Sequence, residues 1–220
     1  WSSDVCSSDL IGNKNNSSWS LRGYLAIKYA NVDFEEVMVS LRPSLDRASL
    51  DRLTPAGKVP TLKHGNNYIW DSLAICEYMN DLHPEKNFWP KNINIRAHAR
   101  CIYAEMPSGF TALRSVMGMA CLNKFECPKL TGDLKNDIDR IISIWSECVK
   151  QYGSIGPYLF GKYSIADMMY APVILRFKSY QIELPDVLIK YFDTMINHQD
   201  IEEWCLDADP NDTAEPINKL

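Results

Sequence analysis

The chain has 220 residues, of which 46% are hydrophobic and 23% charged, and its formal net charge at pH 7 is −5. This length suffices for one large domain or two small ones with buried cores, and the composition is that of a globular protein. The acidic charge without a dense Lys/Arg run disfavours nucleic acid, and no apolar run approaches the roughly 20 residues that span a bilayer. We therefore expect a cytoplasmic protein, without a secretory signal, that binds neither nucleic acid nor membrane.

Residues 1–9 differ in character from the rest of the chain. They are rich in Ser and Asp, repeat the triplet Ser-Ser-Asp and show no structural period. They resemble the in-frame translation of a DNA-sequencing adapter, and we exclude them from functional arguments for that reason. Leu10 and Ile11 are then expected to be the remaining part of a first strand, whose native beginning is missing.

Helices and strands alternate over residues 10–82. Apolar residues recur at helical spacing from about Leu21 to Asn31, after a polar loop. The pattern next predicts a strand within 34–41, a short helix over 43–53, a strand over 59–62, a turn at 65–67, a strand over 68–70 and a helix over 72–82. The order β-α-β-α-β-β-α predicts a thioredoxin-like domain, because a helical crossover makes the first strand pair parallel and a hairpin makes the last pair antiparallel.

The remainder of the chain is predicted to be helical. Residues 83–94 carry two prolines and no period, which is typical of a linker, and residues 95–206 are expected to form an all-α domain. Its predicted helices cover 93–123, with a kink at Pro107, then 132–152, 164–180, 185–197 and 201–206. The polar tail 207–220 is expected to be loosely ordered.

The cysteines and histidines do not suggest a metal site. Seven cysteines are scattered over the chain, their number is odd and no pair forms a Cys-x-x-Cys motif. Reduced thiols of a cytoplasmic protein are the simplest interpretation. The four histidines also lack the spacing of metal ligands and are interpreted as surface or structural residues: His64, His83, His98 and His198.

A proline pair could expose backbone groups for a ligand. Val59-Pro60 lies between a Gly-containing loop and a predicted strand. In a thioredoxin-like sheet the proline at this place is typically cis, which turns the backbone of Val59 outward so that its N–H and C=O can pair with a bound peptide. The alternative, which this motif alone favours, is an ordinary proline at the first position of a strand.

Two helix starts carry further candidates. Asp71-Ser72 stands at a strand-to-helix junction, where the helix N-terminus can hold a carboxylate and Asp71 an ammonium, as an amino-acid head group requires. Ser17 and Ser18 precede the first helix, and a hydroxyl there can donate to a ligand thiolate; lowering a thiol pKa by two units takes about 2.7 kcal/mol. The alternative for both places is helix capping, with Ser72 as the N-cap of its helix.

The three motifs are expected at one end of the sheet. Together they would contact an amino-acid head, a peptide backbone and a thiol, in the order in which these groups occur in glutathione. The stretches SSWSLRGYLAIKYA, LTPAGKVPTL and WDSLAICEYMNDLHP resemble the cytosolic glutathione S-transferase superfamily. YSIADMMYAPVI looks like its helical-domain capping motif, in which Ser164 caps and Asp167 follows three residues later.

The resemblance implies a fold, a cofactor and roles for named residues. It covers about residues 10–206 and looks closest to bacterial serine-type members, with some similarity to the zeta class of maleylacetoacetate isomerases. It implies a homodimer that uses glutathione as co-substrate and no metal, with Ser17 as the thiol-activating serine and Ser18 as the near alternative. The positions that match the glutathione site are Lys58, Val59, Pro60, Asp71 and Ser72.

The second substrate is less defined by the resemblance. Trp19 stands where zeta enzymes carry a cysteine, and Pro107 where similar bacterial sequences carry a histidine. The expected lining of an electrophile pocket is Trp19, Met106, Phe110, Arg114 and Met117. The alternative is core packing for the methionines and a surface position for the arginine.

The sequence thus predicts a glutathione transferase that conjugates the glutathione thiolate to a small electrophile. A glutathione-dependent isomerase of the maleylacetoacetate type, or a peroxidase, is the alternative on the same scaffold. A non-catalytic binding protein with this fold is a further alternative.

Overall fold

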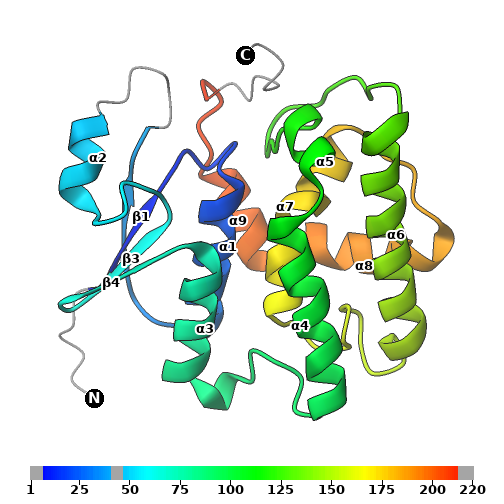
Figure 1. Ribbon diagram of the computed structural model, residues 1–220, viewed down its shortest axis with the longest axis horizontal. Helices are drawn as coiled ribbons and strands as arrows, with labels where there is room; N and C mark the ends of the chain where they lie inside the picture. Colours follow the sequence, from blue (N-terminus) through cyan, green and yellow to red (C-terminus); the bar gives the residue numbers. More distant parts are fainter. Residues whose placement is uncertain (1–6, 41–46, 213–220) are drawn as a thin grey trace.

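The computed structural model describes residues 7–40 and 47–212. A four-stranded sheet stands at one side of the molecule and a helical domain at the other, with helix α1 between them (Figure 1). The elements of the first domain are β1 (Ser7–Ile11), α1 (Ser18–Ala30), β2 (Glu35–Met38), α2 (Arg47–Leu53), β3 (Thr61–His64), β4 (Asn67–Trp70) and α3 (Ser72–Leu82). The predicted start of α2 at Pro43 lies outside the described residues.

The sheet has the order β2-β1-β3-β4. β1 pairs with β2 in parallel and with β3 in antiparallel orientation, and β3 and β4 form the antiparallel hairpin. The predicted thioredoxin-like domain is therefore confirmed, including the parallel first pair that the helical crossover requires.

Helix α1 is buried along most of its length because both domains pack on it. Leu21, Leu25 and Ile27 are fully buried in the core shared by the two domains. Gly23 allows the close approach of the neighbouring elements, since a Cβ at this position would lie 3.3 Å from Pro60 and 3.3 Å from Ile75 of α3. A larger residue at this position would require the side chains of Pro60 and Ile75 to move.

Strand β1 begins earlier than predicted. Ser7 to Asp9, which belong to the adapter-like stretch, occupy strand positions next to β2 and β3. Asp9 is completely buried, and neither of its carboxylate oxygens has a hydrogen-bond partner among the described residues. Burial, and to a smaller extent the charge of Glu36, raises the pKa of the Asp9 carboxyl well above its ordinary value. A buried position in a strand favours an apolar residue, so Asp9 does not suit its place.

The second domain is helical in its described part. It contains α4 (Ile93–Ser108), α5 (Thr111–Val116), α6 (Gly132–Tyr152), α7 (Ile165–Ser179), α8 (Asp186–Ile196) and α9 (Gln199–Leu206), and a short 3₁₀ turn, Pro84–Lys86, precedes it. No helix in the described ranges 7–40 and 47–212 is both long and apolar enough to cross a membrane.

The prediction of one long helix over 93–123 is wrong. α4 ends at Ser108, and α5 is a separate helix that ends at Val116. Pro107 lies in the last turn of α4, and the break follows at Phe110, whose φ of 53° is left-handed and cannot continue a right-handed helix.

Helix α7 is the centre of the second domain and begins with the predicted capping box. The Ser164 backbone N–H donates to the Asp167 carboxylate at 2.9 Å, and the Ser164 side chain accepts from the third backbone N–H of the helix. The tail is more firmly held than expected as far as Asp212, which is buried and accepts a hydrogen bond on its carbonyl from the Asn15 side chain.

Candidate functional site

The sheet register places the three candidate motifs at one edge. Leu10 of β1 lies opposite Thr61 of β3, which lies opposite Trp70 of β4. Pro60 directly precedes this row and Asp71 directly follows it, while the loop that leads into α1 begins just after β1 ends. The strand pairing alone therefore brings these segments to the same end of the sheet, as predicted.

The loop before β3 presents the backbone of Val59. The Val59-Pro60 bond is cis, and β3 begins at Thr61, later than predicted. The Thr61 hydroxyl donates to the carbonyl of Lys58 at 2.8 Å and lies 2.9 Å from the hydroxyl of Thr54, which holds the loop in place. Within ranges 7–40 and 47–212, no intrachain partner engages the backbone of Val59. Its N–H and C=O are thus available to a peptide-like ligand, beside the exposed Lys58.

The start of α3 differs from the prediction in which residue caps it. Asp71, and not Ser72, is the N-cap: its carboxylate accepts from the Leu73 N–H at 2.9 Å. Asp71 has a φ of 77°, a backbone conformation that is uncommon for a residue other than glycine and is found at functional sites. Because Asp71 caps the helix, the Ser72 hydroxyl is not used for capping.

Ser72 provides an unsatisfied polar group at this helix start. Its side chain is completely buried, and its Oγ has no hydrogen-bond partner among the described residues. An unsatisfied buried hydroxyl costs about 1–3 kcal/mol, which a bound acceptor would offset. A carboxylate suits the place, because the first N–H groups of α3 and its dipole also favour a negative charge. The residues present therefore fit the amino-acid head of glutathione.

The two serines before and in the first turn of α1 are both buried. Ser17 is the N-cap residue, but its side chain makes no capping bond; its hydroxyl donates to the Oγ of Ser20 at 2.8 Å. Ser20 also accepts from the Gly12 N–H at 2.9 Å. Ser18 accepts a hydrogen bond of 2.9 Å from Arg176, so its own O–H remains free to donate. The alternative of plain helix capping is therefore wrong for the Ser17 side chain.

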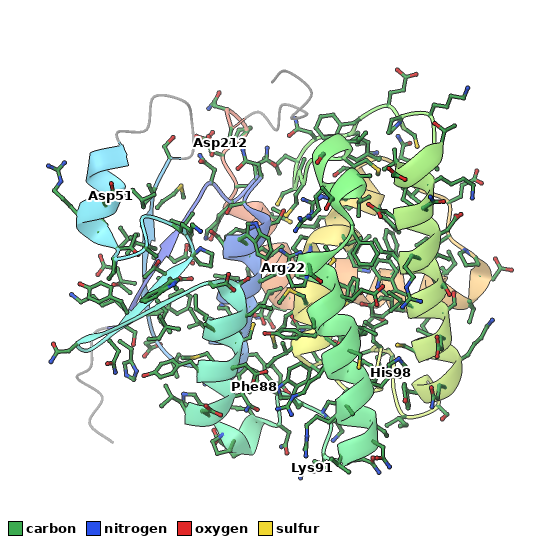
Figure 2. The ribbon with its side chains drawn as sticks, in the orientation of Figure 1. Arg22, Asp51, Phe88, Lys91, His98 and Asp212 are labelled. Atoms are coloured by element: carbon green, nitrogen blue, oxygen red, sulfur yellow. The ribbon has the colours of Figure 1, made fainter. Side chains whose placement is uncertain are left out.

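Two arginines, Arg22 and Arg114, lie against Trp19 next to these serines. The guanidinium carbon of Arg22 lies 4.6 Å from the centre of a Trp19 ring and that of Arg114 lies 5.8 Å from it. Arg22, at the centre of the molecule in Figure 2, donates to the Met169 carbonyl at 2.9 Å, while its Nη2 is buried with no partner in the described part of the chain.

Arg22, Arg114 and Arg176 form an arginine cluster that is not paired with a carboxylate in the described part of the chain. Arg176 donates to the carbonyls of Met117 at 2.7 Å and Pro172 at 3.2 Å, and no ion pair of the three arginines occurs among the described residues. Burial, followed by the repulsion of the other guanidinium groups, lowers the pKa of Arg22 to about 9; burial, followed by Arg114, lowers that of Arg176 to about 10. Arg22 and Arg176 therefore remain charged at neutral pH, and guanidinium groups gathered in this way attract an anion.

The residues predicted to line an electrophile pocket divide into two groups. Trp19 and Arg114 do lie beside the serines, with Arg114 anchored by a 2.9 Å bond to the Pro107 carbonyl. Met106 and Met117 are fully buried, as the core-packing alternative expects.

Phe110 is also buried, and it lines a hollow of about 470 Å³ between α5 and α6.

Sequence reasoning missed Arg22 and Arg176. The sequence does contain a signal for them, because each arginine stands in an otherwise apolar helical stretch: Arg22 in LRGYLAI and Arg176 in ILRFK.

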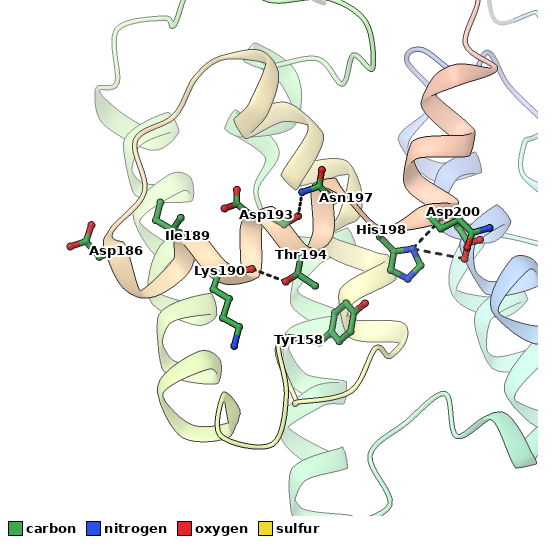
Figure 3. A pocket seen from close by; sticks show the side chains of 10 residues that line it. Tyr158, Asp186, Ile189, Lys190, Asp193, Thr194, Asn197, His198 and Asp200 are labelled. Carbon is green, nitrogen blue, oxygen red and sulfur yellow. Dashed lines mark hydrogen bonds and ion pairs between the residues drawn. The ribbon is translucent and has the colours of Figure 1, made fainter.

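A wider hollow of about 970 Å³ lies over α8 and the start of α9, away from this site (Figure 3). Its lining combines the carboxylates of Asp186, Asp193 and Asp200 with Lys190 and His198, and its Thr194 hydroxyl donates to the Lys190 carbonyl at 2.7 Å. His198 caps α9 by accepting from the Asp200 N–H and stacks on Tyr163, and burial lowers its pKa. We assign it a structural role.

Comparison with known proteins points to one family. The sequence profile of the glutathione S-transferase N-terminal domain matches residues 16–82. A probable maleylacetoacetate isomerase of Caenorhabditis elegans is 32% identical over 172 residues, 78% of each chain. Glutathione S-transferase 1 of Dianthus caryophyllus is 29% identical over 167 residues, 73% of this chain and 72% of the relative.

Solved structures agree on the fold. A glutathione transferase homologue from Burkholderia, crystallised with bound glutathione, superposes with a TM-score of 0.66 at 19% identity, covering 90% of this chain and 94% of that one. The Tau class glutathione S-transferase from mango, Mangifera indica, gives a TM-score of 0.68 at 18% identity, covering 91% and 92%.

Proposed function

Because this chain belongs to the glutathione S-transferase superfamily, with zeta-class maleylacetoacetate isomerases among its relatives, we propose that it binds glutathione and presents the thiolate to a small electrophile. The observation that carries the proposal is the buried, unpartnered hydroxyl of Ser72 at the start of α3, next to the left-handed Asp71. No other place in the described site combines a free hydroxyl, helix N–H groups and a carboxylate within two residues.

The proposed binding mode follows the row of motifs along the sheet edge. Ser72 and the N-terminus of α3 hold the γ-glutamyl carboxylate, and the Asp71 carboxylate takes its ammonium. The backbone of Val59 pairs with the cysteinyl backbone of glutathione, and the exposed Lys58 adds a positive charge nearby. This order leaves the thiol at the start of α1.

The thiolate is stabilised by a serine hydroxyl and by nearby positive charge. Ser18 can donate to the sulfur while its oxygen accepts from Arg176. Ser17, which the family resemblance favours, can donate if the hydroxyl of Ser20 reverses their shared hydrogen bond. In either case the dipole of α1 and the arginine cluster favour the thiolate, and a shift of two pKa units needs only about 2.7 kcal/mol.

The arginine cluster favours an anionic second substrate and therefore supports the isomerase alternative. Maleylacetoacetate, the substrate named for several relatives, carries carboxylates that Arg176 and Arg114 could bind beside the thiolate. Addition of the thiolate to a cis double bond, rotation about the resulting single bond and elimination would return glutathione unchanged. Trp19, stacked on Arg22, would form a flat wall for the substrate.

The proposal is tested with the purified protein. Calorimetric titration should show glutathione binding, and the turnover of 1-chloro-2,4-dinitrobenzene, maleylacetoacetate and cumene hydroperoxide separates transferase, isomerase and peroxidase activity. Binding without turnover of any of them would indicate the non-catalytic alternative, and no glutathione binding would refute the proposal.

We also propose that the protein is a cytoplasmic homodimer, as expected from the family resemblance. Sizing chromatography coupled to light scattering measures the mass of the assembly and thus tests the dimer directly. A mass near the 25.2 kDa of one chain at micromolar concentration would contradict it.

A further inference from the structure

Two cysteines meet where the segment after α5 contacts α9. Cys121 lies in that segment and Cys205 in the last turn of α9, and their thiols share a hydrogen bond. Both side chains are partly exposed, unlike the buried Cys76 and Cys148. We propose that Cys121 and Cys205 are a redox-sensitive pair, which glutathione disulfide converts into a disulfide that fastens the loop before α1. The reaction needs no glutathione at the thiol site, so it stands apart from the proposed function.

A single backbone carbonyl in the loop before α1 brings the two cysteines together. The indole N–H of Trp204 in α9 donates to the Lys14 carbonyl at 2.8 Å, and the Cys121 thiol donates to the same oxygen at 3.3 Å. Cys205 directly follows Trp204 in α9. The folded chain therefore holds Cys121 beside the end of α9 while both thiols are reduced.

The two thiols differ in their acidity. The hydrogen bond from Cys121 lowers the pKa of the Cys205 thiol, and the positive charge of Lys178 acts in the same direction, whereas burial and Glu202 oppose them. The same bond, followed by burial, raises the pKa of the Cys121 thiol. Because the thiolate is the attacking species, Cys205 is the nucleophile and Cys121 is the thiol that completes the bond.

The reaction consists of two thiol–disulfide exchanges. The Cys205 thiolate attacks one sulfur of glutathione disulfide, which forms a mixed disulfide and releases one glutathione thiolate. This thiolate takes the proton of Cys121, whose sulfur then attacks the Cys205 sulfur and releases the second glutathione; that thiolate takes up the proton that Cys205 gave to the solvent. Two protein thiols are oxidised to one disulfide while one glutathione disulfide is reduced to two glutathione molecules, and an excess of reduced glutathione reverses the reaction.

The disulfide acts on the loop before α1 because its two ends hold that loop from two sides. The backbone N–H groups of Cys121 and Leu122 donate to the side-chain oxygen of Asn15 at 2.8 and 3.2 Å. The Lys14 ammonium pairs with Asp207, directly after α9, at 2.9 Å, and α9 lies beside α1 (Figure 1). A covalent bond between these two attachments opposes local opening of the loop.

The first test is chemical and uses the reduced full chain with glutathione disulfide at neutral pH. Free thiols are then alkylated, and mass spectrometry of the peptides should find a Cys121–Cys205 disulfide that reduced glutathione in excess removes. Cys121→Ser should instead keep a glutathionyl group on Cys205. Cys205→Ser should leave Cys121 at least about 10-fold less modified, since its thiol stays protonated on the Lys14 carbonyl. Cys101→Ser, which removes the exposed cysteine of α4, is the matched control and should leave the disulfide unchanged.

The second test measures the loop itself by hydrogen exchange. On oxidation, the exchange of the Cys121 and Leu122 amides should slow at least about fivefold, because both amides are bonded to Asn15 and exchange only when the loop opens. The Cys101→Ser control should show the same slowing, and Cys121→Ser should show none at Leu122.

Three outcomes would overturn the inference. The first is a chain in which Cys205 does not react or keeps its glutathionyl group although Cys121 is present. The second is a disulfide that joins either residue to another cysteine. The third is unchanged amide exchange in a chain that carries the Cys121–Cys205 bond. All three are measured on the unsubstituted chain, so they decide the inference even if a variant fails to fold.

Discussion

Arg176 in α7 donates a hydrogen bond of 2.9 Å from its Nη2 to the Oγ of Ser18 in the first turn of α1. This bond crosses from the helical domain to the first domain, and it joins the arginine cluster to a hydroxyl that can face the glutathione sulfur. In the proposed function, this bond would couple binding of the second substrate to thiol activation.

Arg176→Met should separate these two tasks. Loss of a charge-assisted hydrogen bond costs about 1.5–3 kcal/mol, so we expect kcat/KM for an anionic substrate to fall about 10- to 100-fold. The glutathione Kd should change less than about threefold, because Arg176 lies away from the α3 start. Arg140→Met, which removes an exposed arginine paired with Glu105, is the matched control and should leave both values unchanged.

If Arg176→Met lowered kcat/KM by the same factor for anionic and for neutral electrophiles, the cluster would not bind the second substrate. Arg176→Lys keeps the charge without the forked geometry and should recover only part of the activity.

Ser17→Ala and Ser18→Ala distinguish the two candidate thiol donors. The variant that removes the donor should raise the pKa of bound glutathione by about one to two units, equivalent to about 1.4–2.7 kcal/mol. Thiolate absorbance near 240 nm, recorded against pH, measures this shift. Turnover at neutral pH should fall while glutathione affinity is nearly kept. An unchanged thiol pKa in both variants would exclude a serine donor at either position.

Ser72→Ala should act on binding and on stability in opposite directions. Glutathione affinity should fall about 10-fold, since the carboxylate loses a hydrogen bond. Without ligand, the free energy of unfolding should stay equal or rise by up to about 1 kcal/mol, because the buried hydroxyl has no partner to lose. Calorimetry and urea denaturation measure the two effects, with the exposed Ser108→Ala as control. A marked loss of stability in the ligand-free variant would show that the hydroxyl has an intrachain partner.

Asp9→Leu should stabilise the protein by about 1–3 kcal/mol at pH 7, because a buried carboxylate without partners is replaced by an apolar side chain. The pH dependence has a definite sign. Burial raises the folded-state pKa of the Asp9 carboxyl above its unfolded-state value. Below about pH 4 the carboxyl is protonated in both states and costs little stability, whereas the free energy of unfolding falls as the pH rises from there through the folded-state pKa. The advantage of Asp9→Leu should therefore grow from pH 4 to 7. Urea denaturation at several pH values tests this, and an advantage that shrinks with pH would contradict the burial of Asp9.

Several elements followed directly from local sequence. α3 over Ser72–Leu82 and α6 over Gly132–Tyr152 have the predicted bounds, because regular apolar spacing and flanking breakers define them. The parallel first strand pair could also be predicted, since one crossover helix leaves little choice of topology. The position of the three candidate motifs at one end of the sheet could be predicted for the same reason, because the strand order brings them together.

Other features depend on contacts that local sequence does not contain. Gly109 caps α4, but the left-handed residue that breaks the helix is the next one, Phe110, and phenylalanine does not predict this conformation. Arg22 and Arg176 were missed because their partners, the carbonyls of Met169 and Met117, are 147 and 59 residues away. Which of Asp71 and Ser72 caps α3 depends on the backbone angle at Asp71, and both residue types are good caps.

The position of α1 has a consequence for how the chain folds. Its apolar residues belong to a single core cluster that includes side chains from α3, α4, α6 and α7, and Arg22 reaches the backbone of α7. A fragment that ended after α3 would expose this face of α1 and leave the buried guanidinium without its carbonyl. We therefore expect the two architectural domains to unfold together, as one cooperative unit with a single transition by every probe.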